Sequence, residues 1–581
     1  MPPRRTSKAV AVNGDAKTEE KKQPAKQAAK PASKPAAKPA SKPASKPAAK
    51  PLARSRSAKR VAEDEGANRD TSPPPPAKRR KAAAKADDEV VESEPKPKSA
   101  PKRLRKSASK EEAVPEKVGK EEKKKVEKVK VPKVQNLFNP LPSPPEHTRP
   151  APVLFVWGAG NFGQFAMGED HLGELEKPTR NKLIEQKIAE GAFGEEGAGI
   201  EAVAAGGMYT LFVDEQGTIW SSGTNDDAAL GRITTDVPNP DKEGEFLDVD
   251  TLTAQPWPLQ SLKDEGFRAT RIAAGDSISA ALSAEGELRV WGSFRSVEGL
   301  LGFSDGQKHQ FLPVPILNIK SKPDDPEKFS SVVAGNNHLV VLTTHGNIYT
   351  WGAGEQGQLG RKVLERRKIH GTTPEKIVLG TRSRKAVAVG AGNYTSFAVD
   401  DKGDVWAWGL NNMGQTGTGS SDSEVQLPRK VVGLGKIDLG GDDTVVQIAG
   451  GEHHTIFLTA KGKVYACGRS NGGQLGIPED DPVLAERDED HKDMLNTPHL
   501  VPFPDDDDPV IQVSAGIHNN LAVTKDGALF TWGTGPQSEL GAGDESELKT
   551  PKMIVRREGG AWSVVEGSCG GQHTVALLRK K

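Results

Sequence analysis

Residues 334–352 read AGNNHLVVLTTHGNIYTWG, and five further stretches of the chain repeat the same order of small, apolar and turn residues. In each stretch the first glycine lies 11 residues before a second glycine and 16 residues before the position that Trp351 holds here. Self-similarity at a fixed spacing indicates a repeat architecture in which neighbouring units share a core. The other stretches begin at Ala205, Ala274, Ala391, Gly450 and Ala515, and their equivalents of Trp351 are Ser222, Trp291, Trp408, Cys467 and Trp532.

Each unit has the pattern of a β-hairpin. An apolar run, Leu339–Thr343, precedes a polar turn that ends at Gly346, and an alternating run, Asn347–Trp351, follows it. The Ala-Gly pair that starts most units allows neighbouring backbones to pack closely near an axis. Successive units begin 54–69 residues apart, which leaves room for outer strands and loops of variable length.

The two ends of the repeat region complement each other. A last copy begins as CGGQHTVALL at Cys569, but Lys581 is reached before its turn glycine. The missing half, VLFVWG, occupies residues 153–158. Dividing one repeat between the termini closes a ring and removes exposed sheet edges. We therefore expect an all-β fold over residues 151–581, a seven-bladed β-propeller whose last blade is closed by both termini.

Residues 1–150 have a different composition. They hold about 39 Lys and Arg against about 19 Asp and Glu, and they include the low-complexity stretch KPASKPAAKPASKPASKPAAKP. Too little apolar surface is available to offset the entropy of ordering, so we expect a disordered basic tail. Scattered cations in an extended chain suit non-specific DNA binding by counterion release. Residues 151–581 carry the opposite balance, about 41 cationic against about 60 anionic side chains.

Two basic clusters in the tail are separated by an acidic and then proline-rich spacer, an arrangement similar to a bipartite nuclear import signal. The alternative is that these charges only keep the tail soluble. The clusters consist of Lys59 and Arg60, and of Lys78, Arg79, Arg80 and Lys81.

Several function classes lack support. The two cysteines, Cys467 and Cys569, form no zinc-binding pattern, and neither a signal peptide nor an apolar run of membrane-spanning length is present. The glycines of residues 158–163 and 352–357 match GxGxxG, but further β repeats follow them instead of the helix that a dinucleotide site needs. We expect no cofactor, no metal, no membrane association and no covalent catalysis.

Histidines recur at one repeat position, three residues after the aligned glycine. They are His338, His454 and His573, and Tyr209 holds the same position in another unit. Recurrence at a fixed repeat position favours a structural role, such as hydrogen bonding near the propeller centre.

One unit departs from the others. After Trp291 the chain reads GSFRSVEGLLG over residues 292–302, where other units have compact turns such as GAGEQGQLG. Function on a symmetric ring is expected where the units differ, although a tolerated loop variation is the alternative.

The WGSFR sequence of residues 291–295, GEQGQLGR of residues 354–361 and GGEHHT of residues 450–455 resemble the regulator of chromosome condensation family. The resemblance covers residues 151–581, and the long basic tail matches the fungal members. It implies a chromatin-bound guanine nucleotide exchange factor for the small GTPase Ran. In that family the loop matching residues 294–301 is a β-wedge pressed against the GTPase near its phosphate loop.

The family's interface residues transfer one at a time to this sequence. For exchange, the resemblance implies roles for Phe294, Arg295, Val297, Glu298, Gly299, Asn337 and His453. For contact with the GTPase, it implies Asp276, Arg361 and His573. The position of Asn337 usually holds an aspartate, so the amide here retains hydrogen bonding and loses the charge of a charge-assisted contact.

The resulting hypothesis is a nuclear, chromatin-associated exchange factor whose partners are Ran, the histones and DNA of the nucleosome, and a nuclear import receptor. Two alternatives remain open. One is a propeller adaptor without exchange activity, and the other is an architectural protein that binds histones or DNA.

Overall fold

The six repeated stretches fold as hairpins in one common register. The computed structural model describes residues 137–240, 242–487, 491–504 and 507–581. In every hairpin the position of Trp351 pairs with the residue that follows the recurrent His/Tyr position, for example Thr210 with Ser222 and Ser396 with Trp408. The apolar strands are buried along their whole length because both faces pack on neighbouring sheets.

An inner and an outer strand flank each hairpin to give a four-stranded antiparallel sheet. Five of the sheets formed by the described residues stand alone. They are β2 (Glu174–Arg180), β1 (Val153–Ala159), β30 (His573–Lys580) and β29 (Trp562–Cys569); β3 (Ile200–Ala205), β4 (Tyr209–Asp214), β5 (Ile219–Gly223) and β6 (Trp257–Pro258); β7 (Ala269–Ala274), β8 (Ile278–Ser283), β9 (Leu288–Gly292) and β12 (Gln310–Val314); β13 (Phe329–Ala334), β14 (His338–Thr343), β15 (Ile348–Gly352) and β16 (Glu375–Ile377); and β25 (Val510–Ala515), β26 (Asn519–Thr524), β27 (Leu529–Thr534) and β28 (Glu547–Val555).

The remaining large sheet has eight strands. It divides into two antiparallel halves, which one parallel bridge between Ala391 and Ala449 joins at their inner strands. The halves are β17 (Ala386–Ala391), β18 (Thr395–Asp400), β19 (Val405–Leu410) and β20 (Glu424–Lys430), and β21 (Val445–Gly450), β22 (His454–Thr459), β23 (Val464–Arg469) and β24 (Met494–Leu500).

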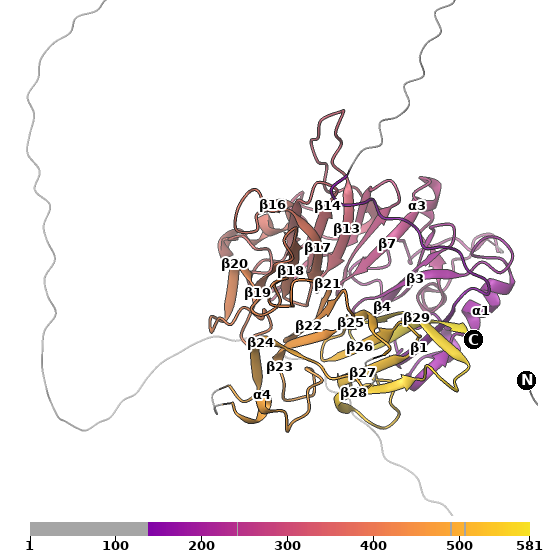
Figure 1. Ribbon diagram of the computed structural model, residues 1–581. Helices are drawn as coiled ribbons and strands as arrows, with labels where there is room; N and C mark the ends of the chain where they lie inside the picture. The colour runs from indigo at the N-terminus through magenta and orange to yellow at the C-terminus, as the bar shows by residue number, and fades with distance from the viewer. Residues whose placement is uncertain (1–136, 241, 488–490, 505–506) are drawn as a thin grey trace, which may run out of the picture. The chain divides into compact units, whose positions relative to one another are not determined.

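The first and last strands of the folded region share a sheet. β1 pairs with β30 in continuous antiparallel register from Val153–Leu578 to Gly158–His573. The split repeat predicts this pairing, and the sheets surround a central channel lined by their inner strands (Figure 1). The expectation of an all-β propeller-like fold is confirmed.

Helices are few and lie in the connections. They are α1 (Lys182–Ala189), α2 (Val249–Ala254), α3 (Gln260–Asp264) and α4 (Pro482–Ala485), with 3-10 helices η1 (Glu169–His171) and η2 (Glu365–Thr372). Within the described residues, none of these helices has the length and apolarity needed to cross a bilayer.

Residues 137–150, here called the strap, pack on the propeller although their composition places them with the tail. Asn139 is buried, and its amide donates to the carbonyls of Thr343 (2.9 Å) and Ala386 (3.0 Å), which belong to two different sheets. The Ser330 hydroxyl donates to the carbonyl of Pro140 at 2.6 Å. The folded region therefore begins before residue 151, because a short polar segment was ordered by groups on strands distant in sequence.

Candidate functional site

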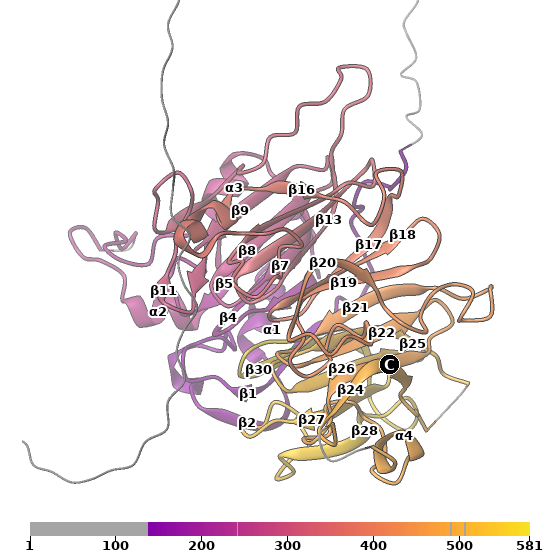
Figure 2. The same ribbon diagram turned by 90° about the vertical axis from the view of Figure 1, so that its left-hand side faces the viewer.

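The departing loop after β9 forms a small hairpin of its own. Its strands are β10 (Arg295–Ser296) and β11 (Gly299–Leu300), which pair Arg295 with Leu300 and Ser296 with Gly299. Val297 and Glu298 form the tip, and Gly299 adopts a φ of +114° that favours glycine. Val297 is 78% exposed. We call residues 294–301 the wedge (Figure 2).

Polar contacts on both sides hold the wedge in place. The backbone N–H of Arg295 donates to Asn337 Oδ1 at 2.9 Å, and the N–H of Val297 donates to Glu355 Oε2 at 3.0 Å. The Arg295 guanidinium pairs with Asp227, which lies in the preceding sheet's loop. Two neighbouring sheets therefore brace the base of the hairpin.

Lys368 adds a further brace from η2. Its ammonium pairs with Glu298 at the tip and lies 3.4 Å from Glu355 Oε1. These carboxylates raise the pKa of Lys368, with the Glu298 hydrogen bond as the main cause. Asp227, Glu355 and Lys368 were not predicted as site residues, because their roles depend on contacts that only the fold creates.

Phe294, for which the resemblance implies a role in exchange, is fully buried. Its ring packs on Phe303 with centroids 5.2 Å apart, and its carbonyl accepts from the N–H groups of Leu301 (2.9 Å) and Gly302 (3.0 Å). Phe294 instead anchors the base of the wedge in the core. Because close packing in the core holds the base, the tip can project into solvent in a fixed position.

The wedge replaces a turn that other units use to bind their neighbours. In the usual turn a backbone carbonyl accepts from the next unit's Trp indole, as that of Gln358 does from Trp408 at 3.0 Å. The same carbonyl accepts from the hydroxyl of Ser396, at the position that pairs with Trp408. The unit after the wedge has Leu339 at that position, and the buried Trp351 Nε1 has no partner among the described residues. The sequence has therefore adapted to the loss of the turn.

Asp276 lies beside the wedge at the mouth of the channel. It lines a recess together with Asp227 and Arg295. Desolvation raises the pKa of the Asp276 carboxyl, the charge of Arg295 opposes the rise, and the charge of Asp227 adds to it. The mouth thus holds an acidic group beside the Arg295 cation, and the contact role of Asp276 stays a prediction.

His453 lies at the repeat position of Asn337. Its side chain is partly buried, and desolvation lowers its pKa while Glu452 opposes the shift. His518 of the following unit lies 3.7 Å from Glu452 through its Nε2. Burial and the neighbouring charges therefore act on this histidine in opposite directions.

Arg361 is held inside its own unit. Its Nη2 donates to the carbonyls of Gly371 (3.0 Å) and Thr373 (2.9 Å), and its Nη1 lies 3.4 Å from Glu375. The equivalent LGR arginine, Arg232, is also buried and bonded to backbone carbonyls. Both arginines tie a long loop to its sheet, and the contact role expected for Arg361 stays a prediction.

His573 is fully buried, which contradicts its expected contact with a GTPase. Its Nε2 lies 2.8 Å from the hydroxyl of Thr210 in the next sheet, and burial lowers its pKa to about 3. His338 and His454 bond Ser396 and Asn520 of their next sheets in the same way, with pKa values lowered to about 4. The structural role predicted from recurrence is confirmed for all three.

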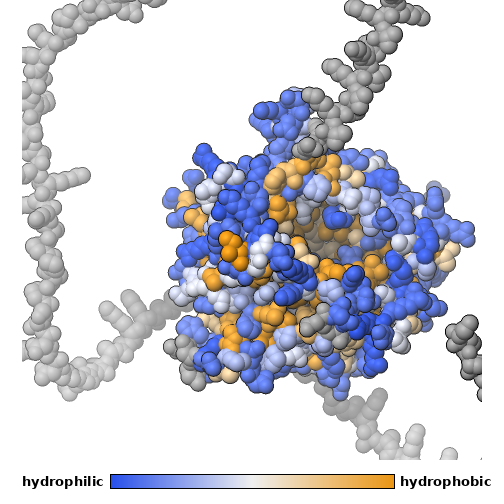
Figure 3. All heavy atoms as spheres, viewed as in Figure 1, coloured by the Kyte–Doolittle hydropathy of each residue, from blue (hydrophilic) through white to orange (hydrophobic). Residues whose placement is uncertain are grey.

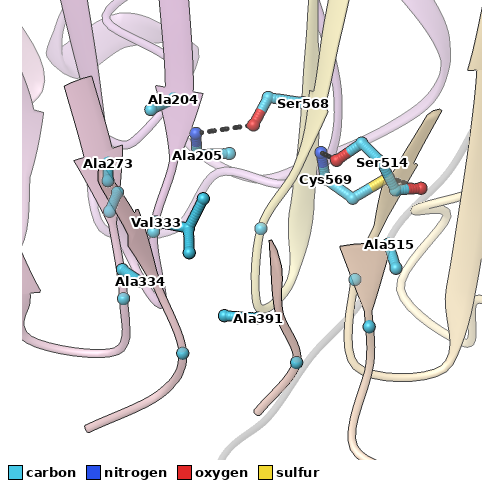
Figure 4. A pocket seen from close by; sticks show the side chains of 18 of the residues that line it. Ala204, Ala205, Ala273, Val333, Ala334, Ala391, Ser514, Ala515, Ser568 and Cys569 are labelled. Carbon is cyan, nitrogen blue, oxygen red and sulfur yellow. Dashed lines mark hydrogen bonds between the residues drawn. The ribbon is translucent and has the colours of Figure 1, made fainter. Parts of the chain in front are cut away.

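Small side chains form part of the lining of the channel. The lining includes Ala205, Ala334, Ala391 and Ala515, which point inward (Figure 4). Its hydroxyl groups bind between sheets: Ser568 accepts from the N–H of Ala205 at 3.0 Å, and Ser514 accepts from the N–H of Cys569 at 3.1 Å. Figure 3 shows the hollow at the centre of the ring with hydrophobic residues at its rim. The channel therefore serves packing, and we place no site in it.

Three side chains with metal-ligating chemistry meet on the strap side of β3 and β4. They are His147, Glu201 and Glu215. However, Arg149 already pairs with Glu215 (2.6 Å), and His147 pairs with Glu201. The cluster is best explained as ion pairs that hold the strap. The predicted import signal at Lys59, Arg60 and 78–81 lies outside the described residues.

Comparisons with known proteins agree on one family. The model of the RCC1-like domain matches residues 153–576. The chain is 34% identical to protein pim1 of Schizosaccharomyces pombe over 454 residues, which are 77% of this chain and 78% of pim1. It is 31% identical to the regulator of chromosome condensation of Xenopus laevis, covering 76% of this chain and 93% of that protein. It is 30% identical to the guanine nucleotide exchange factor SRM1 of Saccharomyces cerevisiae, covering 73% and 86%.

Solved structures give the same result. Prp20p of S. cerevisiae, whose binding to Gsp1p and histones was described with its crystal structure, superposes with a TM-score of 0.63 at 28% identity. The match covers 75% of this chain and 93% of Prp20p. Yeast RCC1 (Prp20) bound to Kap60 also matches with a TM-score of 0.63 at 28% identity, covering 74% and 90%.

Proposed function

This chain belongs to the RCC1-like family of regulators of chromosome condensation, and from that premise we propose that it is a guanine nucleotide exchange factor for the small GTPase Ran. The observation that carries the proposal is the wedge, whose tip is exposed while backbone hydrogen bonds and ion pairs fix its base. A relative, SRM1, is itself named a guanine nucleotide exchange factor. A rigid protrusion of this kind suits a partner that is remodelled on binding.

The proposed mechanism is differential binding. A GTPase holds its nucleotide through phosphate contacts to its P-loop, lysine and Mg²⁺. If the wedge contacts the region next to the phosphate site, the propeller binds the empty GTPase more tightly than the loaded one. The difference lowers the barrier to GDP release without any covalent step, and each 1.4 kcal/mol of difference corresponds to about tenfold.

A rigid wedge is necessary for this mechanism. A flexible loop would lose conformational entropy on binding, and the bound nucleotide would displace it more easily. Backbone hydrogen bonds around the channel mouth contribute to rigidity. Asp276 N–H donates to the Asn336 carbonyl (2.9 Å), Asn336 N–H to Asn393 (3.1 Å), and Asn393 N–H to Gly451 (3.0 Å). Each bond joins neighbouring units, so the residues around the mouth form one connected platform.

We also propose that the sheets form the seven blades of one propeller. The histidines of three units each bond the next sheet, and the divided sheet of β1, β2, β29 and β30 closes the series. A closed ring resists the local opening that an open array of repeats permits at its ends.

For the tail we propose binding to the nucleosome without sequence specificity, and to a nuclear import receptor. The supporting observations are its excess of cations and the partners named for Prp20p, which are histones and Kap60. The location implied is the nucleus, on chromatin. The anionic balance of residues 151–581 leaves the propeller free to attract a cationic protein partner.

The test is fluorescent GDP release from Ran with the full chain and a tip variant, Val297→Ser with Glu298→Ser. We expect the wild-type chain to accelerate release and the tip variant to lower the maximal rate at least about tenfold, because the phosphate-side contact is lost. The matched control is Ile437→Ser, a 90% exposed apolar residue in another loop.

Two outcomes would overturn the proposal. A wild-type chain that binds Ran without accelerating release would favour the adaptor. Release that disappears when residues 1–136 are deleted, with the wedge intact, would favour the architectural protein.

A further inference from the structure

An apolar groove lies on the propeller next to the wedge. Five large apolar side chains, each 42–49% exposed, line one hollow of about 550 Å³. They are Phe162, Leu172, Ile233, Val249 and Phe311. Apolar residues scattered singly over a surface need no explanation, but a set gathered in one concave patch marks an interaction site. We call this set the lateral groove.

The lateral groove is continuous with the base of the wedge. Its walls include the loop after β1, the loop after β5 and strand β12, which is the outer strand of the sheet whose strand β9 leads into the wedge. Thr224 and Asp226 line the lateral groove and also line the recess that contains Asp276 and Arg295. A partner seated on the wedge therefore reaches the groove without a gap of unrelated surface.

The groove is preformed. Buried Arg232 donates to the carbonyl of Leu252 at 2.6 Å, and Ser222 Oγ donates to the carbonyl of Thr253 at 3.0 Å, so α2 is tied to β5. The N–H of Gly168 donates to the carbonyl of Ala254 at 3.0 Å, which ties the loop after β1 to the same C-terminal end of α2. A groove that is already ordered binds without the entropic penalty of forming it.

Its charges select the occupant. Asp226 and Asp250 lie among the apolar residues, and no Lys or Arg is among the residues that the structure describes as lining the groove. The complementary segment is apolar with basic side chains at its flanks. The wedge tip offers only Val297 and Glu298, whereas a stable complex buries about 800 Å² on each partner, so contact areas beyond the tip are required.

We propose that the lateral groove is a second docking surface for the same GTPase that meets the wedge, and that it takes an apolar segment flanked by Lys or Arg. The inference rests on the proposed function. The wedge acts on the nucleotide site, whereas the groove supplies affinity that is the same for the loaded and empty forms. Uniform binding of this kind changes KM and leaves the maximal rate unaltered.

The test uses a double variant of the full chain, Ile233→Ser combined with Phe311→Ser. Its rate of GDP release from Ran is compared with that of the wild-type chain over a range of Ran concentrations. We expect KM to rise about tenfold or more with the maximal rate within about twofold of wild type. Leu427→Ser with Ile437→Ser is the control, since both side chains are at least 63% exposed and lie outside the groove. The control pair should leave both parameters unaltered.

A second pair keeps the test independent of folding. Asp226→Asn with Asp250→Asn removes charge with little change of shape, and it should weaken the dependence of KM on salt. The groove proposal would be overturned if the Ile233→Ser, Phe311→Ser variant had an unaltered KM while the wild-type chain was active and the tip variant was impaired. The proposed exchange function would still hold in that case. A wild-type chain without exchange would overturn both. A Ser pair that abolishes self-association and spares Ran binding would assign the groove to a second copy of the chain.

Discussion

Glu566 shows how one residue changes a repeated contact. Gln447 and Gln512 occupy the same position on their inner strands, and each amide makes two bonds with the next sheet's backbone. Gln447 bonds both the N–H and the carbonyl of Val513 at 3.0 Å, and Gln512 does the same with Gly567 at 2.9 and 3.1 Å. Glu566 holds this position next to Val203, and only a protonated carboxyl can reproduce both bonds.

The pKa of Glu566 is raised to about 7 by desolvation, while the hydrogen bond from Val203 and the charge of Arg271 oppose the shift. A folded pKa above the unfolded one means that the folded state holds the proton more tightly. The stabilisation is therefore complete below about pH 4.5 and is lost as the pH rises through 7.

We predict that Glu566→Gln raises the free energy of unfolding by about 1–3 kcal/mol at pH 8 and leaves it nearly unaltered at pH 5. Urea unfolding at the two pH values measures this. Gln512→Glu should have the opposite effect to Glu566→Gln, because it should lower the free energy of unfolding more at pH 8 than at pH 5. An equal gain for Glu566→Gln at both values would contradict the protonated contact.

At the scale of the element, the wedge changes the interface between two sheets as well as the surface. The usual turn supplies a carbonyl to the next unit, whereas the wedge supplies none to Trp351. Phe294 and Leu339 fill the space with apolar contacts instead. The wedge is therefore built into the core, and residues far from its tip determine its position.

The two tryptophans Trp351 and Trp408 test this interpretation as a matched pair. Both are fully buried, and changing either to Phe removes the same volume. Trp408→Phe also removes the hydrogen bond to Gln358, whereas Trp351→Phe removes an unpaired N–H. We predict that Trp408→Phe destabilises by about 1 kcal/mol more than Trp351→Phe, measured by urea unfolding. Equal losses would mean that Trp351 has an acceptor outside the described groups.

At the scale of the whole molecule, the strap extends the folded domain beyond the repeats. It contacts sheets at both ends: Asn139 lies between β14 and β17, and Arg149 pairs with Glu215 after β4. A chain shortened to residue 151 would leave the carbonyls of Thr343 and Ala386 without these donors. A shortened chain used for biochemical work on the propeller should accordingly start before residue 137.

We predict that Asn139→Ala lowers the free energy of unfolding by about 1–3 kcal/mol, because the variant removes a buried side chain that bridges two sheets. Thermal or urea unfolding of the full chain measures the loss. Ser143→Ala, at an exposed strap position, is the control and should stay within about 0.5 kcal/mol of wild type. Similar values for the two variants would show that the strap adds little to stability.

The sequence by itself determined the all-β propeller-like fold, the pairing of its ends and the structural role of the recurrent histidines. Each rests on a local pattern repeated many times, so errors at one position do not accumulate. The sequence also located the wedge, because a break in a repeat is visible in the sequence alone.

Only the tertiary structure decided which residues of the site are accessible. Phe294 and His573 are buried, Arg361 is bonded to its own loop, and Asp227, Glu355 and Lys368 support the wedge from other units. The lateral groove and the strap were likewise undetermined. Contacts between segments far apart in sequence create burial, bracing and concave surfaces, and no local pattern records which segments meet.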